Sequence, residues 1–291
     1  MKIFDCTTYF SEDMLMDLRF NVLDKFVHKF IVVESIFSHS GKKKNLNFNI
    51  NNFPKFKDKI IYKVIEKEPN GLVNADSPAK KRFNSIKRIE QSYEYMKNGI
   101  DQASESDLII LSDNDEIPNL ESEQFQNTSK DIILFKQLFF YYKFNLLYDK
   151  VKWFGSKACK KKKLKSFSWL RNIKNKTYPS WRIDTYFSKL KYTGIEIIEN
   201  GGWHFTNIKT PQDLFIKMSN FGHHDEFELS GLTVEDIKKK INDKKVFYNH
   251  FSDKSDLNKW TNNDSLEIID LRLLPHYLQK NKDKYQNWWA V

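Results

Sequence analysis

The residues best suited to chemistry lie at positions 113–116, which read Asp-Asn-Asp-Glu. They follow four consecutive aliphatic residues at 108–111, a run typical of a strand that is buried on both faces. Asp113 and Asp115 are spaced to bind a hard divalent cation, Mg²⁺ or Mn²⁺, that takes its other ligands from water and phosphate oxygens. Such a cation would neutralise a departing diphosphate. The alternative is an ordinary acidic turn that ends at Pro118.

A second candidate for metal binding is His204, which follows two glycines and Trp203. The glycines predict a tight turn that would hold the imidazole beside the indole ring. A neutral imidazole is a common ligand for ions such as Mn²⁺. The competing interpretation is a histidine that makes a structural hydrogen bond, and the local pattern leaves both open.

An alternation of strands and helices in the first half of the chain would position these residues. A helix with Ser11 as its N-cap is predicted after the first strand, and Ser77 and Pro78 begin a second helix that ends at Gly99. Strands that alternate with helices pair in parallel, and ligands collect at their carboxyl ends. The predicted strands are residues 2–9, 30–33, 60–65 and 108–111.

The second half of the chain is less regular. Helices are predicted to begin at Thr210 and Thr233, each followed by an acid that can complete a capping box. Because no polar linker divides the halves, we expect one α/β domain over residues 1–291, with a mixed Rossmann-type sheet flanked by helices. We also expect strands at 131–142, 181–190 and 192–198, a loop at 151–165, a turn at 201–204 and a terminal helix at 270–280.

Composition limits the class of protein. The chain has 291 residues, of which 40% are hydrophobic and 15% aromatic, so global disorder is excluded. Cys6 and Cys159 have neither disulfide-scaffold nor zinc-site spacing and are interpreted as free thiols. No stretch approaches the roughly 18 apolar residues of a membrane span, and the N-terminus lacks the apolar region of a signal peptide. We therefore expect a cytoplasmic protein.

The formal net charge is +10, and much of the excess lies in the lysine clusters 42–44 and 160–163. Such clusters are compatible with two solvated loops, or with a surface that meets an anionic acceptor such as a lipid-linked saccharide. The second possibility would make the protein peripheral at a membrane. Charge alone does not choose between them.

Four segments, taken together and in order, resemble glycosyltransferase family 17, which includes β-1,4-mannosyl-glycoprotein 4-β-N-acetylglucosaminyltransferase. Each motif is modest alone, but the ordered set is more specific and spans most of the chain. The segments are Asp17–Asn21 leading to Val33-Glu34-Ser35, Ser38–Lys42 and Leu46–Phe48; Asp107–Pro118; Trp153–Lys157; and Gly202–Thr206, followed by a helix and His223.

The resemblance implies a GT-A-like fold and inverting transfer of a sugar, GlcNAc above all, from a UDP-sugar to a saccharide acceptor. It implies that residues 1–120 bind the nucleotide sugar and residues 121–291 the acceptor. Asp113 and Asp115 would act on the metal and the diphosphate or ribose, and His204 would be a metal or diphosphate ligand. Glu34 would contact the uridine or ribose, and Lys157 would neutralise phosphate.

Inverting transfer needs a general base, and the sequence offers three candidates. Asp225 and Glu226 follow the fourth motif, and Asp184 follows Arg182, with which it could simply pair. The segment 220–227 is one residue longer than the family pattern, so which acid matches is open. Residues 160–180 match the family poorly, and no acceptor contact is carried over there.

Other classes of function compete with sugar transfer. A metal-dependent nucleotidyltransferase or phosphohydrolase also uses paired acids on nucleotide phosphates. A non-catalytic polyanion- or saccharide-binding protein would use the net charge and the aromatic residues, but leaves the acidic cluster unexplained. Nucleic acid is not an expected partner, because no RNP, zinc-finger or helix-turn-helix signature is present.

Overall fold

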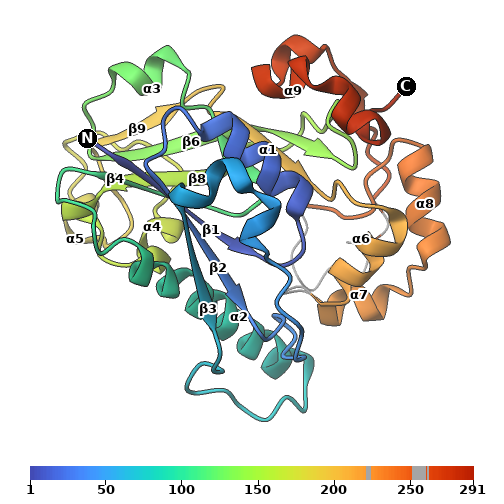
Figure 1. The fold of residues 1–291 in the computed structure, drawn as a ribbon. Coiled ribbons are helices and arrows are strands. Elements are labelled where there is room, and N and C mark those ends of the chain that lie inside the picture. Colours follow the sequence, from blue (N-terminus) through green and yellow to red (C-terminus); the bar gives the residue numbers. More distant parts are fainter. Residues whose placement is uncertain (221–223, 251–259, 261) are drawn as a thin grey trace.

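The computed structural model describes residues 1–220, 224–250, 260 and 262–291, without the side chain of Asp225. Eleven strands in this part form one mixed sheet with helices on both faces (Figure 1). The expected α/β architecture is confirmed. None of the described helices combines the length and the apolar character needed to cross a bilayer.

The first half of the chain forms a parallel sheet in the order β3-β2-β1-β4, the strand order of a Rossmann half. All four predicted strands are confirmed, as β1 (Ile3–Tyr9), β2 (Lys29–Ser35), β3 (Ile60–Ile65) and β4 (Leu108–Ser112). Helix α1 (Asp13–Leu23) connects β1 to β2, and α2 (Pro78–Tyr95) lies between β3 and β4 in the chain. This order brings the carboxyl ends of β1, β2 and β4 to one edge.

The second half extends the sheet with antiparallel pairing. Strand β8 (Trp153–Lys160) lies between β4 and β6 (Ile132–Tyr141) and is antiparallel to both. Strand β6 also pairs in parallel with β9 (Ile195–Ile198) and β10 (Gly202–Thr206). The remaining strands are β5 (Glu116–Pro118), β7 (Leu146–Leu147) and β11 (Glu267–Ile268).

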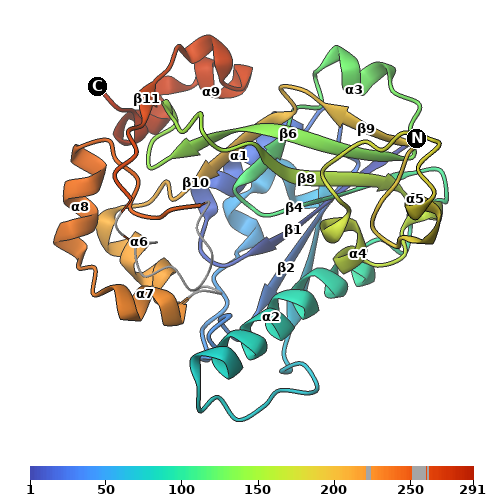
Figure 2. The same cartoon turned by 180° about the vertical axis from the view of Figure 1, so that it is seen from behind.

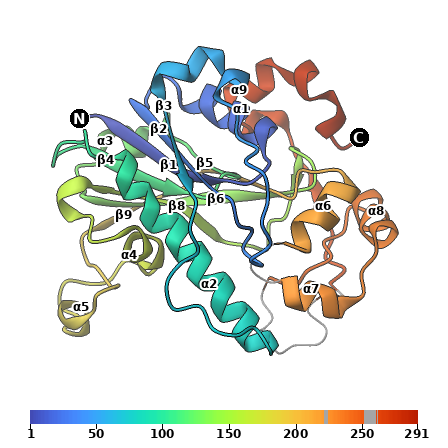
Figure 3. The same ribbon diagram turned by 60° about the horizontal axis from the view of Figure 1, so that its bottom comes forward.

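The sheet separates two apolar layers, and Figures 2 and 3 show the helices that cover them. Alternate residues of β1 face opposite layers: Ile3 joins the core under α1, and Phe4 joins the core under α2. The other helices are α3 (Glu123–Asn127), α4 (Phe167–Asn172), α5 (Asp184–Phe187), α6 (Pro211–Met218), α7 (His224–Ser230), α8 (Val234–Asn242) and α9 (His276–Lys280), with short 3₁₀ turns at Ile50–Asn52, Pro54–Lys59, Met96–Gly99, Lys161–Lys163, Leu271–Leu273 and Lys282–Trp288.

Local capping signals predicted several helix starts correctly. The side chains of Ser77, Thr210 and Thr233 each accept a hydrogen bond from the backbone at the start of α2, α6 and α8. Thr233 and Asp236 form a complete capping box. Ser11 is not a cap, because α1 begins one residue later than expected, after Glu12.

The predicted loop at 151–165 was wrong, because residues 153–160 form the central strand β8. Its polar residues are buried against partners: the Ser156 hydroxyl lies 2.7 Å from that of Ser112. Gly155 permits a close approach, since a Cβ there would lie 2.4 Å from the Glu116 carboxyl carbon. Polar composition therefore concealed an interior strand.

Three further predictions in the second half were wrong. Residues 202–204 of the predicted turn belong to β10, where Gly202 has φ of +134° and a Cβ would lie 2.1 Å from the Ile117 carbonyl oxygen. The pair of glycines thus serves strand packing and not a turn. Residues 181–190 contain α5 in place of a strand, and the terminal helix is limited to α9.

Candidate active site

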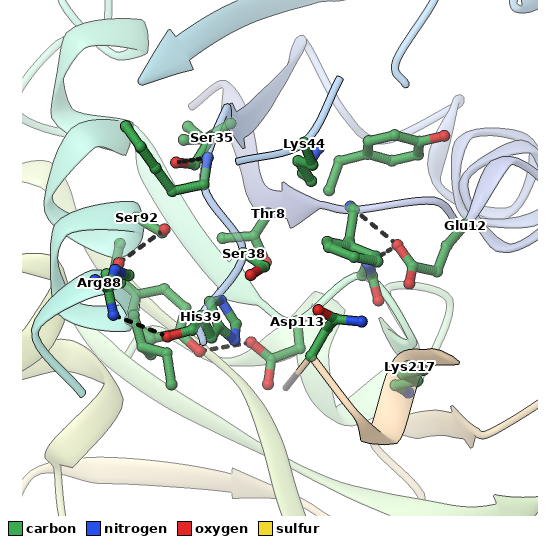
Figure 4. A pocket seen from close by; sticks show the side chains of 18 of the residues that line it. Thr8, Glu12, Ser35, Ser38, His39, Lys44, Arg88, Ser92, Asp113 and Lys217 are labelled. Atoms are coloured by element: carbon green, nitrogen blue, oxygen red, sulfur yellow. Dashed lines mark hydrogen bonds between the residues drawn. The ribbon is translucent and has the colours of Figure 1, made fainter. Parts of the chain in front are cut away.

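A pocket of about 320 Å³ opens at the edge of the sheet where β1, β2 and β4 end (Figure 4). Aromatic residues after β1 and the loop after β2 form one side, and α2 forms another. Its described lining includes more basic than acidic residues, and three of the basic ones pair with acids outside the lining. The basic residues are Lys44, Arg82, Arg88, Arg171 and Lys217, and the acidic residues are Glu12, Asp113 and Asp115.

Asp113 lies in the pocket and is held by two neighbours. The Tyr93 hydroxyl from α2 donates to its Oδ1 at 2.8 Å, and Arg171 Nη2 from α4 donates to its Oδ2 at 2.9 Å. Burial raises the pKa of Tyr93, so its hydroxyl keeps its proton and remains a donor. The Arg171 guanidinium also lies over the Tyr93 ring, 4.7 Å from its centroid.

Asp115 is more deeply buried than Asp113 and faces two other basic groups. Its Oδ1 lies 3.4 Å from His204 Nε2, and its Oδ2 lies 3.7 Å from Lys217 Nζ. Burial alone would raise the pKa of Asp115, but His204 and Lys217 outweigh burial and hold this pKa well below its ordinary value. The carboxylate is therefore ionised across the physiological range of pH.

Two buried groups fix the backbone of the acidic loop. Glu116 accepts from the Asp113 backbone N–H and from Trp153 Nε1, each at 2.8 Å. Arg19 from α1 pairs with Asp5 and donates to the backbone carbonyl of Glu116. The loop is therefore an ordered structure and not a solvated acidic turn.

His204 lies behind the pocket on β10. Its ring stacks on Trp153 with centroids 4.6 Å apart and packs edge-on against Phe139 at 4.5 Å. Its buried Nδ1 has no hydrogen-bond partner among the residues that the structure describes, while Nε2 faces Asp115. The imidazole is thus placed to act on the carboxylate of Asp115.

Arg171 and His39 line the pocket, but neither was among the proposed ligands. Lys157 Nζ donates to the backbone carbonyls of Arg171 and Ile173 at 2.7 and 2.6 Å, which fixes the end of α4. Burial lowers the pKa of His39 to about 4, against a smaller opposing effect of Asp113, so this imidazole is neutral at pH 7. Arg171 lies in the segment that matches the family pattern poorly, so the sequence did not indicate it as a site residue. Its place in the site becomes visible in the structure, where Lys157 holds its backbone.

Besides His204 and Glu226, three predicted site residues do not belong to the pocket lining. Glu34 accepts from Lys44, the Asn47 and Phe48 backbone N–H groups and Tyr62, so its carboxylate organises the loop after β2. Lys157 acts on the backbone near Arg171, as described above. Asp184 is exposed on α5, with its oxygens 2.6 Å from Arg182 Nε and 2.7 Å from Lys191 Nζ.

The other two predicted acids lie on α7. Glu226 is largely buried and pairs with Arg82, a pocket residue of α2, at 2.9 Å. This pairing brings Glu226 to the border of the pocket. The side chain of Asp225, and residue His223, lie outside the described residues.

The acidic loop offers a divalent cation the carboxylates of Asp113 and Asp115. Within the described residues, no group of three or more His, Cys, Asp and Glu side chains is arranged to hold a metal. Two carboxylates on one ordered loop nevertheless suit Mg²⁺ or Mn²⁺, which commonly uses one or two protein carboxylates and completes its shell with phosphate and water. The chemistry of the loop thus fits a metal that binds together with a diphosphate.

Comparison with known protein families shows which family the chain belongs to. Residues 1–174, more than half of the chain, match the family described as Glycosyltransferase family 17. The chain belongs to glycosyltransferase family 17. The match covers β1 to β4, the acidic loop, β8 and Arg171, so the pocket is largely built from the family's matched region. This glycosyltransferase has no match among curated proteins.

Solved structures give only distant similarities. The 2-C-methyl-D-erythritol 4-phosphate cytidylyltransferase of Francisella tularensis is 12% identical, covers 76% of this chain and 100% of its own, and has a TM-score of 0.35. HddC from Yersinia pseudotuberculosis is 11% identical, with coverages of 70% and 91% and a TM-score of 0.31. The inositol-1-phosphate CTP transferase from T. maritima is 14% identical, with coverages of 81% and 96% and a TM-score of 0.34.

Proposed function

We propose that this glycosyltransferase transfers a sugar, GlcNAc in the first instance, from a UDP-sugar to a saccharide acceptor by an inverting, metal-dependent reaction. The observation that carries the proposal is the convergence of Asp113, Asp115 and Arg171 in one pocket at the end of β4. Two carboxylates and a cation at a sheet edge suit a diphosphate bound together with a divalent ion.

Asp113 and Asp115 would hold Mn²⁺ or Mg²⁺. When bound, this ion would supply neutralisation of the charge that develops on the leaving nucleoside diphosphate. His204 would keep Asp115 ionised and oriented. It would become a metal ligand only if the Asp115 carboxylate rotated away from His204 Nε2.

Arg171 would bind the diphosphate of the donor. Its guanidinium offers paired N–H donors that match phosphate oxygens, and its backbone is held by Lys157. The guanidinium is satisfied by Asp113 in the structure. An exchange of partners, in which Arg171 turns to phosphate and Asp113 to the cation, would retain the charge balance of the site.

The uracil would lie between the chain segments that follow β1 and β2. Tyr9 and Phe10 offer apolar faces there, and Ser35 and Ser38 offer hydroxyl groups. Most of the described lining comes from the first 120 residues, which supports assigning donor binding to that half and acceptor binding to residues 121–291. The neutral His39 adds a hydrogen-bonding group without adding charge.

Glu226 is the proposed general base. It would remove the proton from the acceptor hydroxyl that attacks the anomeric carbon in line with the leaving diphosphate. Its contact with Arg82 holds the carboxylate at the border of the pocket.

The decisive experiment follows both sugar transfer and phosphate release, with UDP-GlcNAc, a saccharide acceptor and Mn²⁺. The proposal expects a glycosylated product and free UDP, loss of turnover on chelation, and recovery with Mn²⁺ or Mg²⁺. Asp115→Asn, which keeps the shape of the side chain, should abolish turnover, whereas Asp184→Asn should not. Release of phosphate or pyrophosphate without sugar transfer would instead indicate a phosphohydrolase or nucleotidyltransferase.

A further inference from the structure

The loop between α4 and β9, residues 174–191, projects from the body of the protein, with α5 at its tip (Figure 3). We call it the α5 loop. Its base is closed by the Lys174 backbone N–H, which donates to the Leu190 carbonyl at 2.9 Å. Trp169 Nε1 of α4 donates to the Lys189 carbonyl at 2.9 Å. The loop is therefore anchored to the helix that also carries Arg171.

The tip of the α5 loop is held by its own polar groups. Asp184 bridges Arg182 and Lys191, and the Thr185 hydroxyl donates to the Arg182 carbonyl at 2.6 Å. Thr185 is the buried residue of the tip. These contacts give the tip its shape without using its large apolar side chains.

The apolar side chains of the tip point to solvent. Trp181 is 78% exposed, Ile183 71%, Tyr186 73% and Phe187 85%, all within seven residues. Single exposed apolar residues are normal on a protein surface, but a concentrated group marks an interaction site. Burial of these side chains by a partner would recover their hydrophobic free energy.

The charge around this apolar group is strongly positive. The loop contains five basic residues against one acidic residue, Asp184, whose charge is already compensated. Lys174, Lys176 and Lys189 form no ion pair with any other residue that the structure describes. Tryptophan and tyrosine beside lysine are typical of the boundary between lipid headgroups and acyl chains, and lysines add attraction to anionic lipid.

We propose that the α5 loop docks this protein onto a membrane surface that contains anionic lipid. Trp181 and Phe187 enter the headgroup region, and the surrounding lysines contact lipid phosphates. A saccharide fits the surface less well, because the only carboxylate of the loop is occupied by Arg182 and Lys191. The lysine clusters singled out in the sequence are less available to lipid, because some of their members form ion pairs within the protein. Lys44 pairs with Glu34, and Lys160 pairs with Asp131.

The test is sedimentation of the full chain with lipid vesicles, without donor or metal, so that its result does not depend on the proposed reaction. The protein should sediment with phosphatidylcholine vesicles that contain phosphatidylglycerol, less with phosphatidylcholine alone, and less as salt is raised. Replacing Trp181 and Phe187 together by serine should lower the partition coefficient roughly tenfold or more. Lys176→Glu should weaken binding to the anionic vesicles only.

The matched control is Leu229→Ser, since Leu229 on α7 is 81% exposed but lies outside the α5 loop. It should sediment as the wild type does, and all variants should keep the wild-type unfolding temperature. The proposal is overturned if the wild type does not bind anionic vesicles, or if the double variant binds them equally well. Normal vesicle binding by a double variant that has lost transfer to a soluble acceptor would make the loop an acceptor surface instead.

Discussion

The Arg171 guanidinium donates to Asp113 Oδ2 at 2.9 Å, so a basic side chain of α4 pairs with the first acidic residue of the loop that follows β4. The contact joins two segments that are far apart in the chain but both lie within the family-matched region. The two charges satisfy each other within the pocket, and under the proposed function a donor and a metal would provide new partners for both.

Replacement of Arg171 by methionine should weaken UDP binding much more than uridine binding. The arginine would contact the diphosphate, and a hydrogen bond to a charged group contributes about 1.5–3 kcal/mol, or roughly ten- to hundredfold in Kd. Titration calorimetry with UDP and with uridine measures the difference. The Kd of Arg171→Lys for UDP should lie between the values for the wild type and for Arg171→Met, because lysine keeps the charge but loses the paired donors. Equal loss for uridine and UDP would show that Arg171 only shapes the pocket.

Replacement of Glu226 by glutamine should lower kcat with little change in the KM for the donor. A general base contributes about 10²- to 10⁴-fold to the rate, and the amide cannot accept the proton. Asp184→Asn is the matched control, since Asp184 is exposed and paired on the α5 loop. A Glu226→Gln variant with full activity would remove this residue from the mechanism and direct attention to Asp225.

The stability of the protein should fall in mild acid because of His39. Burial lowers its pKa in the folded state from 6.5 to about 4. Between these values the unfolded chain binds a proton that the folded chain does not, so unfolding becomes more favourable as pH falls through this window. Between pH 7 and pH 4.5 the wild type should lose on the order of 2 kcal/mol more of its free energy of unfolding than His39→Gln does. The difference is moderate because the ring is only partly shielded from solvent. Urea unfolding at pH 7 and pH 4.5 measures it, and parallel losses in both proteins would contradict the assignment.

Arg19→Met should destabilise the whole fold. Arg19 and Asp5 form an ion pair with no solvent exposure, and removal of one partner leaves a buried charge at a cost of about 3–5 kcal/mol. The change would also free the carbonyl of Glu116 and so loosen the acidic loop. Denaturant unfolding gives the free energy, and Arg19→Met combined with Asp5→Leu should recover part of it. A loss below about 1 kcal/mol would contradict this role.

The parallel half of the fold was predictable because its signals are local. Aliphatic runs predicted β2 and β4, and Ser77 predicted the start of α2 through capping chemistry. In the second half, the same chemistry at Thr210 and Thr233 predicted the starts of α6 and α8. Strand β8 escaped prediction because its buried polar residues are satisfied by distant partners. Propensity does not record such partners, since they belong to the tertiary structure.

The candidate site was predictable to a similar degree. The acidic loop was found because Asp113 and Asp115 follow a buried strand directly. Arg171 was missed because its importance arises from the packing of α4 against α2 and from Lys157. Glu34 and Lys157 were identified as notable residues from their motifs, but their side chains hold the backbone of neighbouring segments and do not line the pocket. A motif alone does not distinguish these two kinds of residue.

The most direct test of the account is a crystal structure of the protein soaked with UDP and Mn²⁺. Manganese should lie between the Asp113–Asp115 loop and the diphosphate, with Arg171 turned from Asp113 toward a phosphate oxygen. Nucleotide bound elsewhere, with both carboxylates still on Arg171, His204 and Lys217, would contradict it.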